Sequence, residues 1–224
     1  MHRFVELVKE ARVRYPEDEF FSEFESSCRV NRLKREFYLA YESALVGLDE
    51  PAWGALKEKS LQHFKNHRDG QLKTGFFAQL NEAFAYRYLV SHGFSNVTFL
   101  PEGRTKQPDL RFKAQSNVGF CEVKSVGISD EEINRRGSHE CIDGSVYARL
   151  SSGFLSKLED KIKTAKEQLG GLSDQNIVYV MVEFDDFTHD YFVEYREQLE
   201  HFIAGYSPAC VILQMGLLGG TVSR

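Results

Sequence analysis

The first 70 residues carry apolar side chains at the three- and four-residue spacing of helices. Asp49 followed by Pro51 is typical of a first helical turn, where an acidic cap and a fixed φ are both favourable. The spacing predicts helical stretches at residues 5–13, 20–47 and 51–67. We expect them to share a small core made of Phe20, Phe21, Phe24, Phe37, Tyr38, Tyr41, Trp53 and Phe64.

After Gly70 the pattern combines an apolar helix with short strands. Residues 74–92 are apolar around most of the helix circumference, so this helix should be buried, and Gly93 suits the left-handed residue that ends a helix. Three short runs rich in β-branched and aromatic residues follow, separated by turn residues. These predicted strands span residues 96–100, 109–114 and 118–126.

The remainder of the chain alternates helices with strands that are apolar on both faces, as in covered parallel sheets. The predicted elements are a polar stretch at 127–153, helices at 154–169 and 190–206, and strands at 176–184 and 209–215. From residue 74 the order is therefore α-β-β-β-α-β-α-β. It predicts an α/β fold with a mixed β-sheet flanked by helices in residues 71–224, after an N-terminal helical region in residues 1–70.

Composition places the chain among ordinary globular proteins, with 42% hydrophobic and 27% charged residues. No apolar run approaches the roughly 18 residues that cross a bilayer, so we expect a cytoplasmic location and no membrane partner. The four cysteines are scattered without close pairs, which indicates neither a zinc site nor a disulfide framework. The formal charge of −5 argues against a protein that coats nucleic acid with its whole surface, but it permits a local basic groove.

Three charged residues stand where strands usually carry apolar or uncharged side chains. Asp109 begins one predicted strand, and Glu122 and Lys124 lie in the next. If the hairpin turns at residues 115–116, Asp109 and Glu122 are equidistant from the turn and lie opposite each other. Opposed residues point to the same face, and the alternation of side chains puts Lys124 on that face too.

Such a cluster carries an electrostatic cost and suggests a ligand. Two carboxylates about 5 Å apart repel by roughly 3 kcal/mol at an effective dielectric constant of about 20. A divalent cation removes that penalty, and hard oxygen ligands suit Mg²⁺ or Mn²⁺. A water acidified by the metal and aligned by Lys124 would then attack a phosphate. The alternative is an ion cluster on the sheet surface in which Lys124 neutralises the carboxylates.

At these residues the chain resembles the restriction-endonuclease-like nucleases, the PD-(D/E)XK superfamily. Pro108-Asp109 is similar to the PD motif, and Glu122-Val123-Lys124 is similar to (D/E)XK. The resemblance extends over roughly residues 74–184, whose αβββαβ order is similar to the core of that superfamily. It implies that Asp109, Glu122 and the carbonyl of Val123 ligate the metal, and that Lys124 positions or activates the attacking water.

The resemblance also singles out residues in the two neighbouring helices. Glu82 occupies the place of a glutamate that many members carry, which implies a further metal ligand. Gln168 resembles a glutamine that some branches place beside the site, and Lys166 is a candidate phosphate contact. The alternatives are a solvated or salt-bridged Glu82 and an ordinary exposed helix around Gln168.

Basic residues gather before and within the predicted hairpin. The candidate nucleic-acid-binding residues there are Arg104, Lys106, Arg111 and Lys113. Arg111 and Lys113 alternate with apolar residues and so share the face of Asp109, as a phosphate-binding groove requires. Lysines also recur along the helix at 154–169, but exposed lysines are commonplace on amphipathic helices, so that row identifies nothing by itself.

The sequence thus predicts an Mg²⁺- or Mn²⁺-dependent nuclease that hydrolyses phosphodiester bonds in DNA. Its N-terminal helices would bind the substrate, recruit a partner subunit or form a homodimer. Two alternatives stay open. One is a non-catalytic binding or assembly module on the same fold, and the other is an RNA-cleaving member of the same superfamily.

Overall fold

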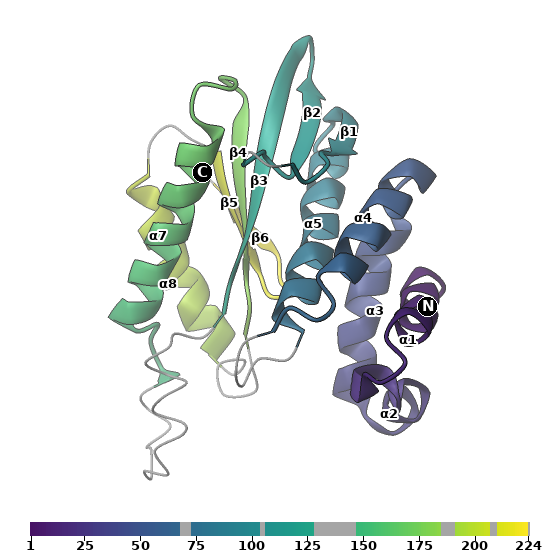
Figure 1. Cartoon of the computed structure of the whole chain (residues 1–224). Helices are drawn as coiled ribbons and strands as arrows, with labels where there is room; N and C mark the ends of the chain where they lie inside the picture. Colours follow the sequence, from purple (N-terminus) through teal and green to yellow (C-terminus); the bar gives the residue numbers. More distant parts are fainter. Residues whose placement is uncertain (68–72, 104–105, 128–146, 185–190, 207–209, 224) are drawn as a thin grey trace. The chain divides into compact units, whose positions relative to one another are not determined.

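The computed structural model describes residues 1–67, 73–103, 106–127, 147–184, 191–206 and 210–223. An N-terminal run of helices precedes a mixed six-stranded sheet with helices between its strands (Figure 1). This architecture confirms the predicted α/β class. Among the residues described, no helix is both long and apolar enough to cross a membrane.

The chain divides into two compact units. The helical unit comprises Met1–Gly93 with Val97–Pro101, and the sheet unit comprises Phe94–Asn96 with Glu102–Arg224. This division groups the helix at Thr74–Ser91 with the helices before it, whereas the boundary predicted at residue 70 groups it with the sheet. The domain boundary predicted at residue 70 stays a prediction.

The helices of the helical unit begin and end largely where the sequence chemistry indicates. They are α1 (Arg3–Arg14), the 3₁₀ turn η1 (Glu19–Phe21), α2 (Phe24–Val30), α3 (Arg32–Val46), α4 (Glu50–Gln62) and α5 (Thr74–Ser91). The Asp49 side chain accepts a hydrogen bond from the Ala52 N–H at the start of α4, 2.8 Å away. Half of the 18 residues of α5 are buried, in line with the prediction of a buried helix, and Gly93 follows it with a φ of +83°.

The long helical stretch predicted over residues 20–47 is wrong as a continuous helix. The chain divides it into η1, α2 and α3. At Asn31 the backbone is extended (φ −112°, ψ 109°), and the Asn31 side chain accepts a hydrogen bond from the Lys34 N–H at 3.0 Å. Asparagine is a strong N-cap residue, so it starts a new helix although the apolar spacing continues across it.

The aromatic core predicted for these helices is present. Phe21 is 1% exposed, and its ring centroid lies 6.1 Å from that of Phe4, 6.0 Å from that of Phe24 and 5.8 Å from that of Phe64. Phe37 differs from the prediction, because 38% of it is exposed. Rings at these separations attract one another beyond the area that they bury, which stabilises the packing of these helices.

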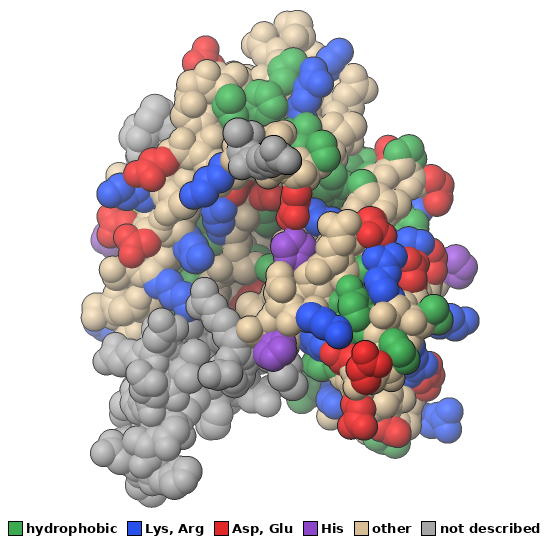
Figure 2. Space-filling model, in the orientation of Figure 1, with side chains coloured by type: hydrophobic (Ala, Val, Ile, Leu, Met, Phe, Trp, Pro, Cys, Tyr) green, Lys and Arg blue, Asp and Glu red, His purple; other side chains and the backbone are tan. Residues whose placement is uncertain are grey.

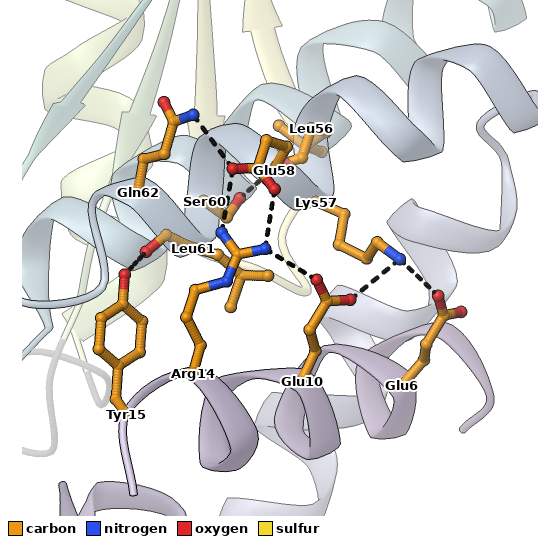
Figure 3. A network of polar contacts seen from close by, with 10 residues as sticks. All are labelled: Glu6, Glu10, Arg14, Tyr15, Leu56, Lys57, Glu58, Ser60, Leu61 and Gln62. Atoms are coloured by element: carbon orange, nitrogen blue, oxygen red, sulfur yellow. Dashed lines mark hydrogen bonds and ion pairs between the residues drawn. The ribbon is translucent and has the colours of Figure 1, made fainter. Parts of the chain in front are cut away.

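Acidic and basic side chains intermingle over the surface of the helical unit (Figure 2). Between α1 and α4 they form the network drawn in Figure 3. Arg14 donates to both carboxylate oxygens of Glu58, at 3.0 and 2.9 Å, and to Glu10 at 3.0 Å. Lys57 pairs with Glu6 at 2.8 Å and with Glu10 at 3.0 Å. These ion pairs join the exposed margins of two helices whose apolar faces are buried.

A buried carboxylate fixes the start of α1 on α3. Glu42 is 8% exposed and accepts hydrogen bonds from the backbone N–H groups of His2 (2.5 Å), Arg3 (3.2 Å) and Phe4 (2.7 Å). The first N–H groups of a helix lack partners within the helix, and a negative charge there is favourable to its dipole. Glu42 therefore caps α1 from a distant part of the sequence.

The sheet unit contains most of a sheet in the order β1-β2-β3-β4-β5-β6. Its strands are β1 (Ser95–Phe99), β2 (Leu110–Ala114), β3 (Asn117–Val126), β4 (Asn176–Val182), β5 (Cys210–Met215) and β6 (Thr221–Ser223). β2 and β3 are antiparallel, β3, β4 and β5 are parallel, and β5 and β6 are antiparallel. The helix α7 (Ser152–Leu169) connects β3 to β4, and α8 (Phe192–Ala204) connects β4 to β5.

One face of the sheet forms a core with α7 and α8. Alternate residues of β3, β4 and β5 contribute to it, among them Val126, Val180 and Leu213, all 0% exposed. The helices contribute the buried residues Phe154, Leu158, Ile162, Ala165, Leu169, Tyr195, Leu199 and Ile203. This face is also the one that carries Glu122 and Lys124, because they alternate in step with Val126 along β3.

The sequence prediction missed β6. A turn with Gly216 at φ +61° returns the chain so that Leu213 pairs with Val222. The strand is only three residues long, which leaves too little alternation to recognise. Most of the polar stretch predicted at 127–153 lies outside the described residues.

Candidate functional site

A two-residue turn brings the charged residues together on the β2–β3 hairpin. Ala114 pairs with Asn117 and Leu110 pairs with Cys121, so the turn is at Gln115-Ser116, as predicted. Gln115 has a φ of +56°, the left-handed conformation that tight hairpin turns require. Continuing this register by one residue places Asp109 opposite Glu122. The predicted turn is therefore confirmed, and its register is the one that the candidate site requires.

Gly119 allows the two strands to approach closely beside the turn. It pairs with Phe112, and a Cβ at this position would lie 2.4 Å from the Phe112 ring and 2.4 Å from the carbonyl oxygen of Gln175. Side-chain carbon atoms do not approach so closely, so only glycine permits this packing. The glycine thus helps to hold the hairpin in the register that sets Asp109 against β3.

The carboxylate of Asp109 is held by the backbone of β3. Asp109 Oδ2 accepts a hydrogen bond from the Val123 N–H at 2.8 Å. The N–H and C=O of one residue in an antiparallel strand point to the same neighbouring strand. The Val123 carbonyl therefore also points towards the side of β3 on which β2 lies. It is near the residue that precedes Leu110, the first residue of β2. A carboxylate and a backbone carbonyl thus lie on the same side of β3.

Glu122 is buried among polar side chains on the face covered by α7. It is 2% exposed, Lys124 Nζ donates to its Oε1, and Gln168 Nε2 donates to its Oε2 at 2.9 Å. The same Gln168 nitrogen donates to the carbonyl oxygen of Gln107 at 2.6 Å. The structure therefore brings together Asp109 from just before β2, Glu122 and Lys124 from β3, and Gln168 from α7.

The oxygens at this cluster suit a hard cation. In the described parts of the chain, no group of three or more His, Cys, Asp or Glu side chains is placed to hold a metal. The donors at the hairpin are two carboxylates and the Val123 carbonyl, and Mg²⁺ typically takes one or two carboxylates and keeps several waters. Each carboxylate oxygen can accept more than one hydrogen bond or ligand, so the bonds from Lys124 and Gln168 do not use up Glu122.

Glu82, a predicted metal ligand, belongs to the helical unit. It is 3% exposed on α5, and its Oε1 lies 2.6 Å from Lys59 Nζ on α4. The side chains of this pair are 4% and 12% exposed, so both charges are largely removed from water. The pair accounts for the burial of Glu82 within its own unit. A role for Glu82 in metal binding stays a prediction.

The predicted nucleic-acid contacts have different surroundings. Arg111 and Lys113 are exposed while Leu110 and Phe112 are buried, so the predicted alternation along β2 is confirmed. Lys106 is exposed and precedes Gln107, whose carbonyl binds Gln168. Arg104 lies outside the described residues.

Lys166 is not brought together with the carboxylates. Its Nζ lies 4.7 Å from the ring centroid of Tyr206, just beyond the end of α8. Lys166 and Gln168 are two residues apart, which places them about 200° apart around the helix. The predicted phosphate contact therefore points to the opposite flank of α7 from Gln168.

The sequence interpretation missed the role of Gln107. This residue lies before β2 and binds Gln168 through its carbonyl, and a contact made by a backbone group leaves no mark on side-chain pattern. Only the spacing between Gln107 and the motif residue Asp109 could have suggested that it is near the site.

Comparison with protein families, with curated proteins and with solved structures gives no match for this chain.

Proposed function

We propose that the sheet unit is a metal-dependent phosphodiesterase that hydrolyses DNA. One observation carries this proposal: the hairpin register sets Asp109 opposite the buried Glu122, with Lys124 on the same face. Sheets rarely place two carboxylates opposite each other, since like charges repel across a strand pair. The same geometry supports the resemblance to the PD-(D/E)XK nucleases, and a cytoplasmic location remains our expectation.

The chain's own residues would hold the reacting groups in place. The Val123 N–H fixes the Asp109 carboxylate, and Gln168 fixes that of Glu122. The Lys124 side chain is 21% exposed, so its ammonium group can turn from Glu122 towards a water or a phosphate oxygen. Mg²⁺ or Mn²⁺, when bound, would acidify a water and neutralise charge that develops on the phosphate. Asp109, Glu122 and the Val123 carbonyl are the groups that would hold the ion.

Incubation of the purified protein with nucleic acids tests this function. Supercoiled, linear and single-stranded DNA and RNA are each combined with Mg²⁺, Mn²⁺ or chelator, alongside Lys124→Ala. We expect cleavage of DNA that needs the metal and that Lys124→Ala slows by about 10²- to 10³-fold, the usual cost of losing one electrostatic contact to the reacting group. Cleavage that is indifferent to metal and to this substitution would contradict the proposal, and cleavage of RNA alone would reassign the substrate.

A second candidate is a non-catalytic binding or assembly module. The bond between Lys124 and Glu122 favours it, because this pair already neutralises the buried carboxylate. Titration with Mg²⁺ or Mn²⁺ separates the two candidates. A catalytic site binds the ion and loses it in Asp109→Asn, whereas a closed ion cluster takes up no metal in either protein.

A further inference from the structure

Two contacts fix how α7 is rotated on the sheet. Gln168 reaches Glu122 on β3 and Gln107 before β2, while Lys166 lies against Tyr206 beyond α8. Between them runs the buried stripe of α7, formed by Phe154, Leu158, Ile162, Ala165 and Leu169. One flank of the helix therefore faces the carboxylate cluster, and the other faces α8.

Two lysines share the flank that faces the cluster. Lys161 and Lys157 precede Gln168 by seven and eleven residues, which is about two and about three turns, so all three point in nearly the same direction. Thr164 lies one turn from Gln168, close to the same line. We call these residues, Lys157, Lys161, Thr164 and Gln168, the Gln168 flank.

This flank presents two of the four lysines of α7. The acidic residues of α7, Glu159, Asp160 and Glu167, are all exposed, and Asp160, one turn before Thr164, borders the flank. Lys157 and Lys161 are only partly exposed, whereas Lys163 is exposed and lies on neither flank. Figure 2 shows Lys and Arg side chains following the length of α7, in the orientation that Figure 1 labels.

The direction of α7 places these lysines on a line that leads away from Glu122. Because α7 connects the parallel strands β3 and β4, it runs antiparallel to both. Gln168, near its end, lies beside Glu122, so Lys161 and then Lys157 lie progressively further towards the Val126 end of β3. Lys161 is about 10 Å from Gln168 along the helix axis, and Lys157 is about 6 Å beyond Lys161.

We infer, building on the phosphodiesterase function proposed above, that Lys161 and Lys157 bind successive phosphates of the DNA strand that enters the cluster. A polyanionic backbone is the ligand that suits evenly spaced ammonium groups on one flank, and lysines contact phosphate without reading sequence. The Gln168 flank thus extends the site from the reacting phosphate to the phosphates beside it. Lys166 and Lys163 lie outside this track.

Binding measured without metal tests the track separately from cleavage. Fluorescence anisotropy of a labelled DNA duplex in chelator, over a range of salt concentrations, gives the slope of log K against log[salt]. We expect Lys157→Gln and Lys161→Gln each to reduce this slope by about 1 and the double variant by about 2, because each lost phosphate contact releases one fewer counterion. Lys163→Gln is the matched control, with the same charge change on the same helix, and should leave the slope unchanged.

Equal slopes for Lys161→Gln and Lys163→Gln would overturn the inference, as would a wild-type protein that binds no DNA. Mg²⁺-dependent cleavage on the same samples keeps the two proposals distinct. If the wild type binds DNA through this track but cuts nothing, the phosphodiesterase proposal fails and the track stands. If the wild type cuts and the control variant matches Lys157→Gln and Lys161→Gln, the track fails and the phosphodiesterase proposal stands.

Discussion

The helical unit and the sheet unit each bury a glutamate, and they hold it in different ways. Glu42 receives its hydrogen bonds from the backbone N–H groups of His2, Arg3 and Phe4. Glu122 receives hydrogen bonds from the side chains of Lys124 and Gln168. Both residues are less than 10% exposed, at 8% and 2%, so burial alone does not separate them.

The difference lies in what can move. The N–H groups at the start of a helix stay where the fold puts them, so Glu42 can release them only if α1 separates from α3. Lysine and glutamine side chains can rotate, so Glu122 can exchange a partner for an ion or a phosphate while the strands stay paired. We therefore expect Glu42 to determine stability and Glu122 to determine activity.

The largest expected effect is the loss of cleavage activity in the Glu122→Gln variant. Removing the negative charge would lower metal-dependent cleavage by about 10³-fold, because the ion loses a charged ligand and the reacting phosphate loses its stabilisation. Glu42→Gln, the same substitution in the other unit, should keep its cleavage per folded molecule. Plasmid nicking rates, corrected for the folded fraction by circular dichroism, measure both. Equal losses of cleavage in the two variants would contradict the different roles proposed for Glu122 and Glu42.

The buried pair of Lys59 and Glu82 should give the next largest effect, on stability. Glu82→Met or Lys59→Met alone should cost about 3 to 5 kcal/mol, because each removes one charge of a buried ion pair and leaves the other charge buried. The double variant should lose much less than either. Denaturant unfolding of the three variants measures this, and additive losses would contradict it.

A smaller effect should appear with pH. Burial raises the pKa of Glu42, but hydrogen bonds from the N–H groups of His2, Phe4 and Arg3 outweigh it and hold the pKa below its ordinary value of 4.5. The folded state therefore binds this proton less tightly than the unfolded state, so the stabilisation is present above about pH 4.5 and is lost as the pH falls through the lowered pKa.

Melting temperatures of the wild type and of Glu42→Gln between about pH 3 and pH 6 measure this effect. The two curves should approach each other as the pH falls. A difference that stays constant over this range would mean that Glu42 does not stabilise α1 through its charge.

The smallest effect is expected from the network between α1 and α4 (Figure 3). Arg14→Ala should cost about 0.5 kcal/mol, because the side chains of Arg14 and Glu58 are 33% and 50% exposed and water screens their attraction. The cost should fall further in about 1 M salt, where exposed charges are screened within a few ångströms. Thermal unfolding at low and high salt measures it. A loss of stability of several kcal/mol that persists in high salt would contradict this prediction, because it would mean that the network behaves like a buried ion pair.

The sequence was informative where local chemistry decides the structure. The hairpin register follows from a two-residue turn, and with it come the opposition of Asp109 to Glu122 and the shared face of Lys124. The buried α5 and the apolar strands β4 and β5 follow equally from their composition. In these segments the pattern of apolar side chains by itself determines that the element is buried.

Other features depend on contacts between distant residues, and the sequence could not reveal them. Nothing near Glu42 in the chain indicates that it caps α1, and nothing near Glu82 identifies Lys59 as its partner. The four lysines of α7 look alike in sequence. They become distinct only when contacts to Glu122 on one side and to Tyr206 on the other fix the rotation of the helix.

Metal uptake tests most directly whether Asp109 and Glu122 form one cation-binding centre. Titration of the protein with Mn²⁺, followed by the electron paramagnetic resonance signal of the free ion, compares the wild type with Asp109→Asn and Glu42→Gln. We predict uptake of about one ion per chain by the wild type and by Glu42→Gln, and a loss of that site in Asp109→Asn, because a hard cation needs both carboxylates. Equal uptake by all three proteins, or none by the wild type, would contradict the assignment of this hairpin as a metal-dependent site.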